Sequence, residues 1–108
     1  MHNLSSALIS DVLDTLGVRN SFCGPQINEL WSGAKVSGQV VTLRCVPTDK
    51  IVDNPYQGLF DLFKVIQPGE VIVIEAGEQD SGVWGELLSV AAIARGSIGV
   101  VTDGLVRD

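Results

Sequence analysis

The stretch VIVIEAG at residues 71–77 decides the fold, because it is a nearly continuous apolar run bounded by turn residues. A run of this kind is typical of a strand that is covered on both faces of a parallel sheet. VWGELLSVAAIAR at residues 83–95 then predicts a helix that stops at Gly96. SIGVVTD at residues 97–103 predicts a second buried strand. Residues 70–102 therefore form a strand–helix–strand unit, whose strands we expect to be parallel because such crossovers are almost always right-handed.

Three further elements are predicted upstream of this unit. SSALISDVLDTLGV at residues 5–18 predicts a helix, because leucine and valine recur at four-residue steps. GQVVTLRCV at residues 38–46 alternates like a strand, and YQGLFDLFKVI at residues 56–66 predicts a short helix. The alternation of helices and strands predicts an α/β layered fold, with residues 1–108 forming a single domain.

Composition and charge exclude several classes of function. An apolar fraction of 45% and a charged fraction of 19% are sufficient for a packed core and argue against disorder. No stretch approaches the roughly 20 apolar residues that span a bilayer, and the start of the chain lacks a signal-peptide pattern. We therefore expect a cytoplasmic protein with no membrane partner. A net charge of −6 with scattered basic residues argues against a nucleic-acid partner.

The cysteines and the histidine narrow the choice of metal site. Cys23 and Cys45 are the only cysteines, and His2 is the only histidine. A zinc site with Cys/His ligands and a catalytic triad that uses histidine are therefore not expected. Any metal would have oxygen ligands, which indicates a hard ion such as Mg²⁺ or Mn²⁺. We expect both cysteines to be small buried hydrophobic residues.

The predicted crossover brings groups that could bind a ligand to one edge of the sheet. The amino end of the helix and the segment 102–108 should be neighbours there, and ligands of open α/β sheets bind at this edge. The first helical turn consists of Gly85, Glu86, Leu87 and Leu88. Backbone N–H groups in a first turn lack helical partners, so together with the helix dipole they can hold a carboxylate or a phosphate.

Charged residues at the same edge complete this candidate site. Arg107 can bind a planar carboxylate through two hydrogen bonds. Asp108 and Glu86 carry oxygen atoms that could hold a divalent ion directly or through water. Taken singly, each has a plainer interpretation: Glu86 can stabilise the helix dipole, and Arg107 with Asp108 can be a solvated ion pair contributing well under ~1 kcal/mol. Their convergence on one edge favours a small-anion site with a hard metal.

The segment GVWGELLSVAAIARGSIGVVTDGLVRD at residues 82–108 resembles the signature of the RraA-like family. This family includes class II 4-hydroxy-4-methyl-2-oxoglutarate / 4-carboxy-4-hydroxy-2-oxoadipate aldolases and regulators of ribonuclease E activity. The aldolase motif is an acidic residue, twenty residues and Arg-Asp, which Glu86, residues 87–106 and Arg107-Asp108 match. SDVLDTLGV, SGQVVTLRC, DNPYQGLFDL and PGEVIVIEAG also resemble the family, so the resemblance covers nearly the whole chain.

The resemblance implies a swivelling α/β/α fold and a homo-oligomer, trimeric or hexameric, with sites between subunits. It implies that Asp108 is the Mg²⁺ (or Mn²⁺) ligand and that Glu86 lies near metal-bound water. It also implies that Arg107 holds a small 2-oxo acid, whose carboxylate the amides of Gly85 to Leu88 receive. The implied reaction is retro-aldol cleavage of a 4-hydroxy-2-oxo dicarboxylic acid to pyruvate through an enolate, with Arg107 and Glu86 as catalytic residues. Oxaloacetate decarboxylation passes through the same enolate.

Members of the family continue beyond the Arg-Asp motif with a further acidic residue and more strands. We therefore expect this chain to be the N-terminal portion of a family member, with a fold that is incomplete at its C-terminus. Two alternatives to the lyase stay open, namely a non-catalytic regulator of ribonuclease E activity and an inactive truncated member. Regulators commonly depart from the acidic-x20-Arg-Asp pattern, which this chain keeps.

Overall fold

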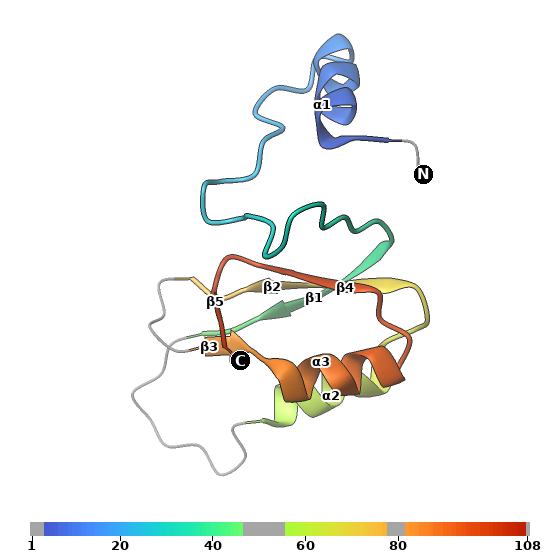
Figure 1. Cartoon of the computed structure of the whole chain (residues 1–108), viewed down its shortest axis with the longest axis vertical. Coiled ribbons are helices and arrows are strands. Elements are labelled where there is room, and N and C mark those ends of the chain that lie inside the picture. Colours follow the sequence, from blue (N-terminus) through green and yellow to red (C-terminus); the bar gives the residue numbers. More distant parts are fainter. Residues whose placement is uncertain (1–3, 47–55, 78–81, 108) are drawn as a thin grey trace.

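Helices and parallel strands alternate along the chain, as the sequence predicts (Figure 1). The computed structural model describes residues 4–46, 56–77 and 82–107. The elements in chain order are α1 (Ser6–Thr15), β1 (Gln39–Arg44), α2 (Gln57–Val65), β2 (Glu70–Glu75), β3 (Gly82–Trp84), α3 (Glu86–Ala94), β4 (Gly99–Thr102) and β5 (Leu105–Val106). The predicted α/β class is confirmed.

The strands form two sheets in which all pairs are parallel. One sheet has the order β1-β2-β4, and the other is the pair β3-β5. The central strand β2 aligns Ile72 with Val41 of β1 on one side and with Val100 of β4 on the other. The chain passes from β2 through α3 to β4, and these two strands are parallel neighbours, so the predicted crossover is confirmed.

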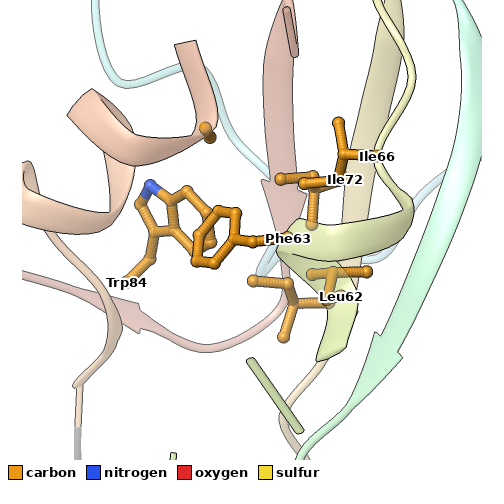
Figure 2. Packing of buried hydrophobic residues seen from close by; sticks show 7 residues of the cluster. Leu62, Phe63, Ile66, Ile72 and Trp84 are labelled. Carbon is orange, nitrogen blue, oxygen red and sulfur yellow. The ribbon is translucent and has the colours of Figure 1, made fainter. Parts of the chain in front are cut away.

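The core lies between β2 and the helices α2 and α3, which cover the same side of the sheet (Figure 1). Ile72 and Ile74 are two residues apart, so both point to this side, where they are fully buried. Figure 2 shows Phe63 of α2 beside Trp84 of β3, with ring centroids 6.4 Å apart and planes inclined by 45°. The buried cluster consists of Leu62, Phe63, Ile66, Ile72, Ile74, Trp84 and Ala92. Trp84 therefore anchors the end of β3 in the core.

The predicted helix over residues 83–95 is wrong at its amino end. Helix α3 begins at Glu86, whereas Gly82–Trp84 is a strand that pairs with Leu105–Val106, a strand that was also not predicted. Burial of the Trp84 ring and pairing with a distant segment outweigh the local helical pattern here. Leu87 of α3 is exposed, and Ala92 is the residue of this helix that is buried in the core.

Helix α1 is capped at both ends and lies apart from the sheet (Figure 1). The Ser5 hydroxyl accepts a hydrogen bond from the Leu8 N–H at 3.2 Å, and Gly17 ends the helix with a φ of 82°. The apolar stripe along the helix is 40–49% exposed at Leu4, Leu8, Ile9 and Val12. The described residues therefore leave this stripe uncovered.

The two cysteines lie in different environments, which corrects one expectation. Cys23 is exposed rather than buried, since it belongs to the irregular segment after α1. Cys45 is half-buried and packs against the core, and this burial raises the pKa of its thiol. Among the described helices, none is both long and apolar enough to cross a membrane.

Candidate functional site

The β3–β5 pair brings the end of the chain to the amino end of α3 (Figure 1). The Arg107 N–H donates a hydrogen bond to the Trp84 carbonyl oxygen at 3.0 Å. Gly85 follows Trp84 directly and is the N-cap of α3. The Arg107 backbone and the first helical turn therefore meet at one edge, as the crossover predicts.

The first turn of α3 has no side-chain cap. Gly85 adopts an extended backbone with φ −166° and ψ −172°, and it has no side chain that could accept from the turn. Glu86 and Leu87 are exposed, and Leu87 is 83% exposed, while Gly85 and Leu88 are half-buried. A turn of this kind presents N–H groups and the positive end of the helix dipole to a small anion.

Arg107 lies along β3 at the same edge. Its side chain passes over Gly82, where an added Cβ atom would lie 3.3 Å from both Cγ and Cδ of Arg107. The absence of a side chain at Gly82 therefore leaves room for the aliphatic stem of the arginine. Arg107 as a whole residue is exposed. Asp108, the predicted metal ligand, lies outside the described residues.

A tight turn between β4 and β5 sets the path that leads to Arg107. The Asp103 carboxylate accepts a hydrogen bond from the Ala76 N–H at 2.7 Å, which ties this turn to the end of β2. The Gly104 N–H donates to the Thr102 hydroxyl at 3.0 Å. A Cβ atom on Gly104 would lie 2.6 Å from the Ala76 Cβ, so only glycine fits this packing without a shift.

Sequence reasoning missed Trp84 and Ser89 as parts of the site. The Trp84 indole N–H donates to the Ser89 hydroxyl at 2.8 Å across the junction between β3 and α3. One signal was present in the sequence, because a buried tryptophan needs a partner for its indole N–H. Ser89 carries the only hydroxyl group within α3. The pair could not be predicted while Trp84 was assigned to the helix.

The residues that could hold a metal are few. Within residues 4–46, 56–77 and 82–107, no three side chains of His, Cys, Asp or Glu gather into a metal-binding group. Mg²⁺ is usually held by one or two carboxylates and several waters, so it does not require such a group. Glu86 and Asp108 carry the oxygen donors that this ion prefers, and the role of Mg²⁺ or Mn²⁺ stays a prediction.

Comparison with known proteins identifies relatives over nearly the whole chain. The sequence profile of the RraA-like family, described as Aldolase/RraA, matches residues 6–108. A solved structure of Streptomyces coelicolor RraAS2, described as an unusual member of the RNase ES inhibitor RraA protein family, aligns with a TM-score of 0.83 at 32% identity. That alignment covers 97% of this chain and 52% of RraAS2.

Two further relatives have similar identities. A structure from Pseudomonas syringae pv. tomato aligns with a TM-score of 0.74 at 30% identity, over 99% of this chain and 47% of that one. Protein DlpA of Legionella pneumophila is 31% identical over 106 residues, which are 98% of this chain and 17% of DlpA. The chain thus spans about half the length of the two solved structures and 17% of DlpA.

Proposed function

Since the chain belongs to the RraA-like family, we propose that it forms the substrate-holding part of a divalent-metal-dependent lyase. The substrate is a 4-hydroxy-2-oxo dicarboxylic acid, and the product is pyruvate. The observation that supports this proposal is the backbone hydrogen bond from the Arg107 N–H to the Trp84 carbonyl oxygen, which brings the Arg107 main chain next to the residue before the uncapped turn of α3. The acidic-x20-Arg-Asp spacing from Glu86 to Arg107 and Asp108 supports it independently.

The substrate would bind through its carboxylate and its 2-oxo group. The N–H groups of Glu86, Leu87 and Leu88 face outward at the helix start and suit the carboxylate. The Arg107 guanidinium suits the 2-oxo oxygen or a second carboxylate oxygen, because it offers two parallel donors. Both groups are positive toward the substrate, so they offset the repulsion from a chain with a net charge of −6.

Cleavage breaks the bond between C3 and C4 of the substrate. The electron pair moves toward C2, which gives the enolate of pyruvate, while the 4-hydroxyl loses its proton and C4 becomes a carbonyl carbon. Arg107 stabilises the negative charge that develops on the C2 oxygen. Glu86 is exposed on the same turn and is the candidate base for the hydroxyl proton, directly or through a water. Protonation of C3 by solvent then completes pyruvate.

A divalent cation would add positive charge at the enolate oxygen. Asp108 is the residue that would hold the cation, and Glu86, the acidic residue that begins the motif, would lie near water bound to it. Decarboxylation of oxaloacetate forms the same enolate, since loss of CO₂ also leaves the electron pair on C3 of pyruvate. We propose it as a second activity of the same site.

The alternative function is regulation of a ribonuclease by direct binding. The likeness to RraAS2, which is described as a member of an RNase ES inhibitor family, favours this candidate. A regulator would bind the ribonuclease through its molecular surface and would not require the catalytic residues Glu86 and Arg107. A pull-down with ribonuclease E distinguishes the two functions. Regulation is supported if the Arg107→Ala variant still binds ribonuclease E and the wild-type protein releases no pyruvate.

A coupled assay for pyruvate tests the lyase. We expect release from 4-hydroxy-4-methyl-2-oxoglutarate or oxaloacetate that requires Mg²⁺ and stops on addition of a chelator. Arg107→Ala should lower kcat/KM by about 100-fold or more, as loss of an oxyanion-stabilising donor does. Arg95→Ala is the matched control, since Arg95 is exposed at the opposite end of α3. Equal rates for the two variants, or activity in chelator, contradict the proposal.

A further inference from the structure

A chain of hydrogen bonds links the parts of the proposed site through Trp84 and Ser89. We propose that Ser89 is a positioning residue, which fixes Trp84 and thereby the placement of Arg107 against the first turn of α3. This inference rests on the proposed function for its meaning in catalysis, although its structural content can be tested separately. Ser89 itself is not expected to touch the substrate.

The direction of each hydrogen bond between Trp84, Ser89 and Gly85 follows from which groups can donate and which can accept. An indole N–H can only donate, so the Ser89 hydroxyl oxygen accepts the bond from Trp84 Nε1 at 2.8 Å. The single hydroxyl proton of Ser89 is then donated to the Gly85 carbonyl oxygen at 2.9 Å. The Ser89 N–H donates to the same carbonyl at 3.0 Å. The Ser89 N–H, hydroxyl proton and hydroxyl oxygen therefore all form hydrogen bonds at the start of α3.

Trp84 transmits this restraint to the other elements of the site. Its side chain is 5% exposed and packs against Phe63 of α2 (Figure 2), so the ring cannot shift independently of the core. Its carbonyl oxygen accepts the bond from the Arg107 N–H. One residue thus connects α2, α3 and the segment that carries Arg107.

The side-chain anchor matters because the backbone pairing is short. Strand β3 has three residues and β5 has two, and the register between Gly82 and Trp84 is irregular. So short a pair of strands is marginal by itself and takes its position from packing. Loss of the Ser89 hydroxyl would free the indole, and the Trp84 carbonyl that holds Arg107 would lose its fixed orientation.

Ser97 provides a matched control for a purely structural role. It is a buried serine close to the other end of α3, and its single hydroxyl proton is shared between the Glu70 carbonyl oxygen at 3.1 Å and the Gly99 carbonyl oxygen at 3.3 Å. Ser97→Ala likewise removes the hydroxyl of a serine that bonds to main-chain carbonyl oxygen, but beyond the opposite end of α3. A merely structural Ser89 would behave like Ser97 when it is replaced by alanine.

The experiment compares Ser89→Ala, Ser89→Thr and Ser97→Ala in the 108-residue chain. The first readout is the amide hydrogen exchange of Arg107 by NMR, relative to the exchange of Ile72 in the core strand. The second is the affinity for oxalate in the presence of Mg²⁺, measured by calorimetry. Ser89→Ala should raise the relative exchange of Arg107 about fivefold or more and weaken oxalate binding by a similar factor. Ser89→Thr keeps the hydroxyl and should restore both, and Ser97→Ala should change neither.

The inference is overturned if Ser89→Ala and Ser97→Ala give the same rate of Arg107 amide exchange relative to that of Ile72. If Ser89→Ala does not fold, Trp84→Phe removes the same donor while keeping a ring in the core, and the same exchange ratio decides the matter. If wild-type protein does not bind oxalate, the proposed function fails. The exchange of Arg107 still decides whether Ser89 positions it.

Discussion

At the scale of single residues, Gly104 occupies a position where the packing admits no side chain. An added Cβ would lie 2.6 Å from the Ala76 Cβ and 2.8 Å from the Val83 Cγ2. Gly104→Ala should therefore lower the free energy of unfolding by about 1–3 kcal/mol, through overpacking beside the site. Urea unfolding followed by circular dichroism measures this loss.

Gly58 in α2 is the matched control for that substitution. A Cβ added there meets nothing within 4 Å, and the residue lies in a helix. Gly58→Ala should be neutral or stabilise the protein by up to about 1 kcal/mol, because alanine restricts the unfolded chain. Equal losses in the two variants would show that the close approach at Gly104 does not matter.

The thiol of Cys45 should titrate at a higher pH in the folded protein than in the unfolded chain. Burial disfavours the thiolate and raises the pKa of this group. Alkylation of Cys45 by iodoacetamide, followed by peptide mass spectrometry, should therefore reach its half-maximal rate at higher pH in buffer than in urea. An equal or lower midpoint in buffer contradicts this prediction.

The sign of the matching stability effect follows from linkage. A raised thiol pKa gives a contribution to stability that is fully present below the unfolded pKa of Cys45. This contribution is lost as the pH rises through the folded pKa, because the unfolded state then binds fewer protons. Cys45→Ser should reduce that alkaline decrease in the free energy of unfolding.

At the scale of elements, the sequence predicts strands and helices well where the apolar pattern is long. The run at residues 71–77 is confirmed as β2, whose buried Ile72 and Ile74 lie on the side of the core. The strands β3 and β5 could not be predicted, since two or three residues show no period. Gly85 gave a signal for the true helix start, because glycine is an acceptable N-cap.

The candidate site was predictable to a similar degree. The parallel crossover alone implies that the end of the chain meets the first turn of α3, and the bond from Arg107 to Trp84 agrees with it. The link from Trp84 to Ser89 was not predictable, because it spans five residues across a strand–helix junction and follows no helical spacing. The apolar pattern of the sequence therefore predicts which helices and strands meet at the site. The individual side-chain hydrogen bonds between them depend on tertiary packing, which the pattern does not show.

Strand β2 should dominate the stability of the sheet. Ile74 is 1% exposed in the central strand, whereas Val40 of β1 is 57% exposed. Ile74→Ala should cost about 2–5 kcal/mol, through lost transfer free energy and a cavity. Val40→Ala should change the free energy of unfolding by about 0.5 kcal/mol or less. Urea midpoints of the two variants test this, and similar values would contradict the assignment of the core.

At the scale of the whole molecule, the chain exposes more surface than its mass requires. Its accessible surface is 8477 Å², against about 5,800 Å² for a compact monomer of 11.5 kDa. Its radius of gyration is 15.5 Å, against about 13 Å for a compact domain of this length. The difference in area exceeds the roughly 800 Å² per partner that a stable interface buries.

We therefore expect the chain to associate in solution through its uncovered apolar faces. Sedimentation equilibrium should give a mass that is a multiple of 11.5 kDa. Leu8→Glu, on the apolar stripe of α1, should weaken this association, because it puts a charge on the surface that becomes buried. Ala7→Glu adds the same charge away from the stripe and should not. A monomer at all concentrations contradicts the expectation.

The burial of Trp84 has a practical consequence, because this chain has only two tryptophans and the other, Trp31, is 69% exposed. A neutral soluble quencher such as acrylamide should quench the emission of the exposed Trp31 first and leave the emission of Trp84, which lies beside the Arg107 edge. The protein thus carries an intrinsic optical reporter, through which the arrival of a small anion could be followed without a label.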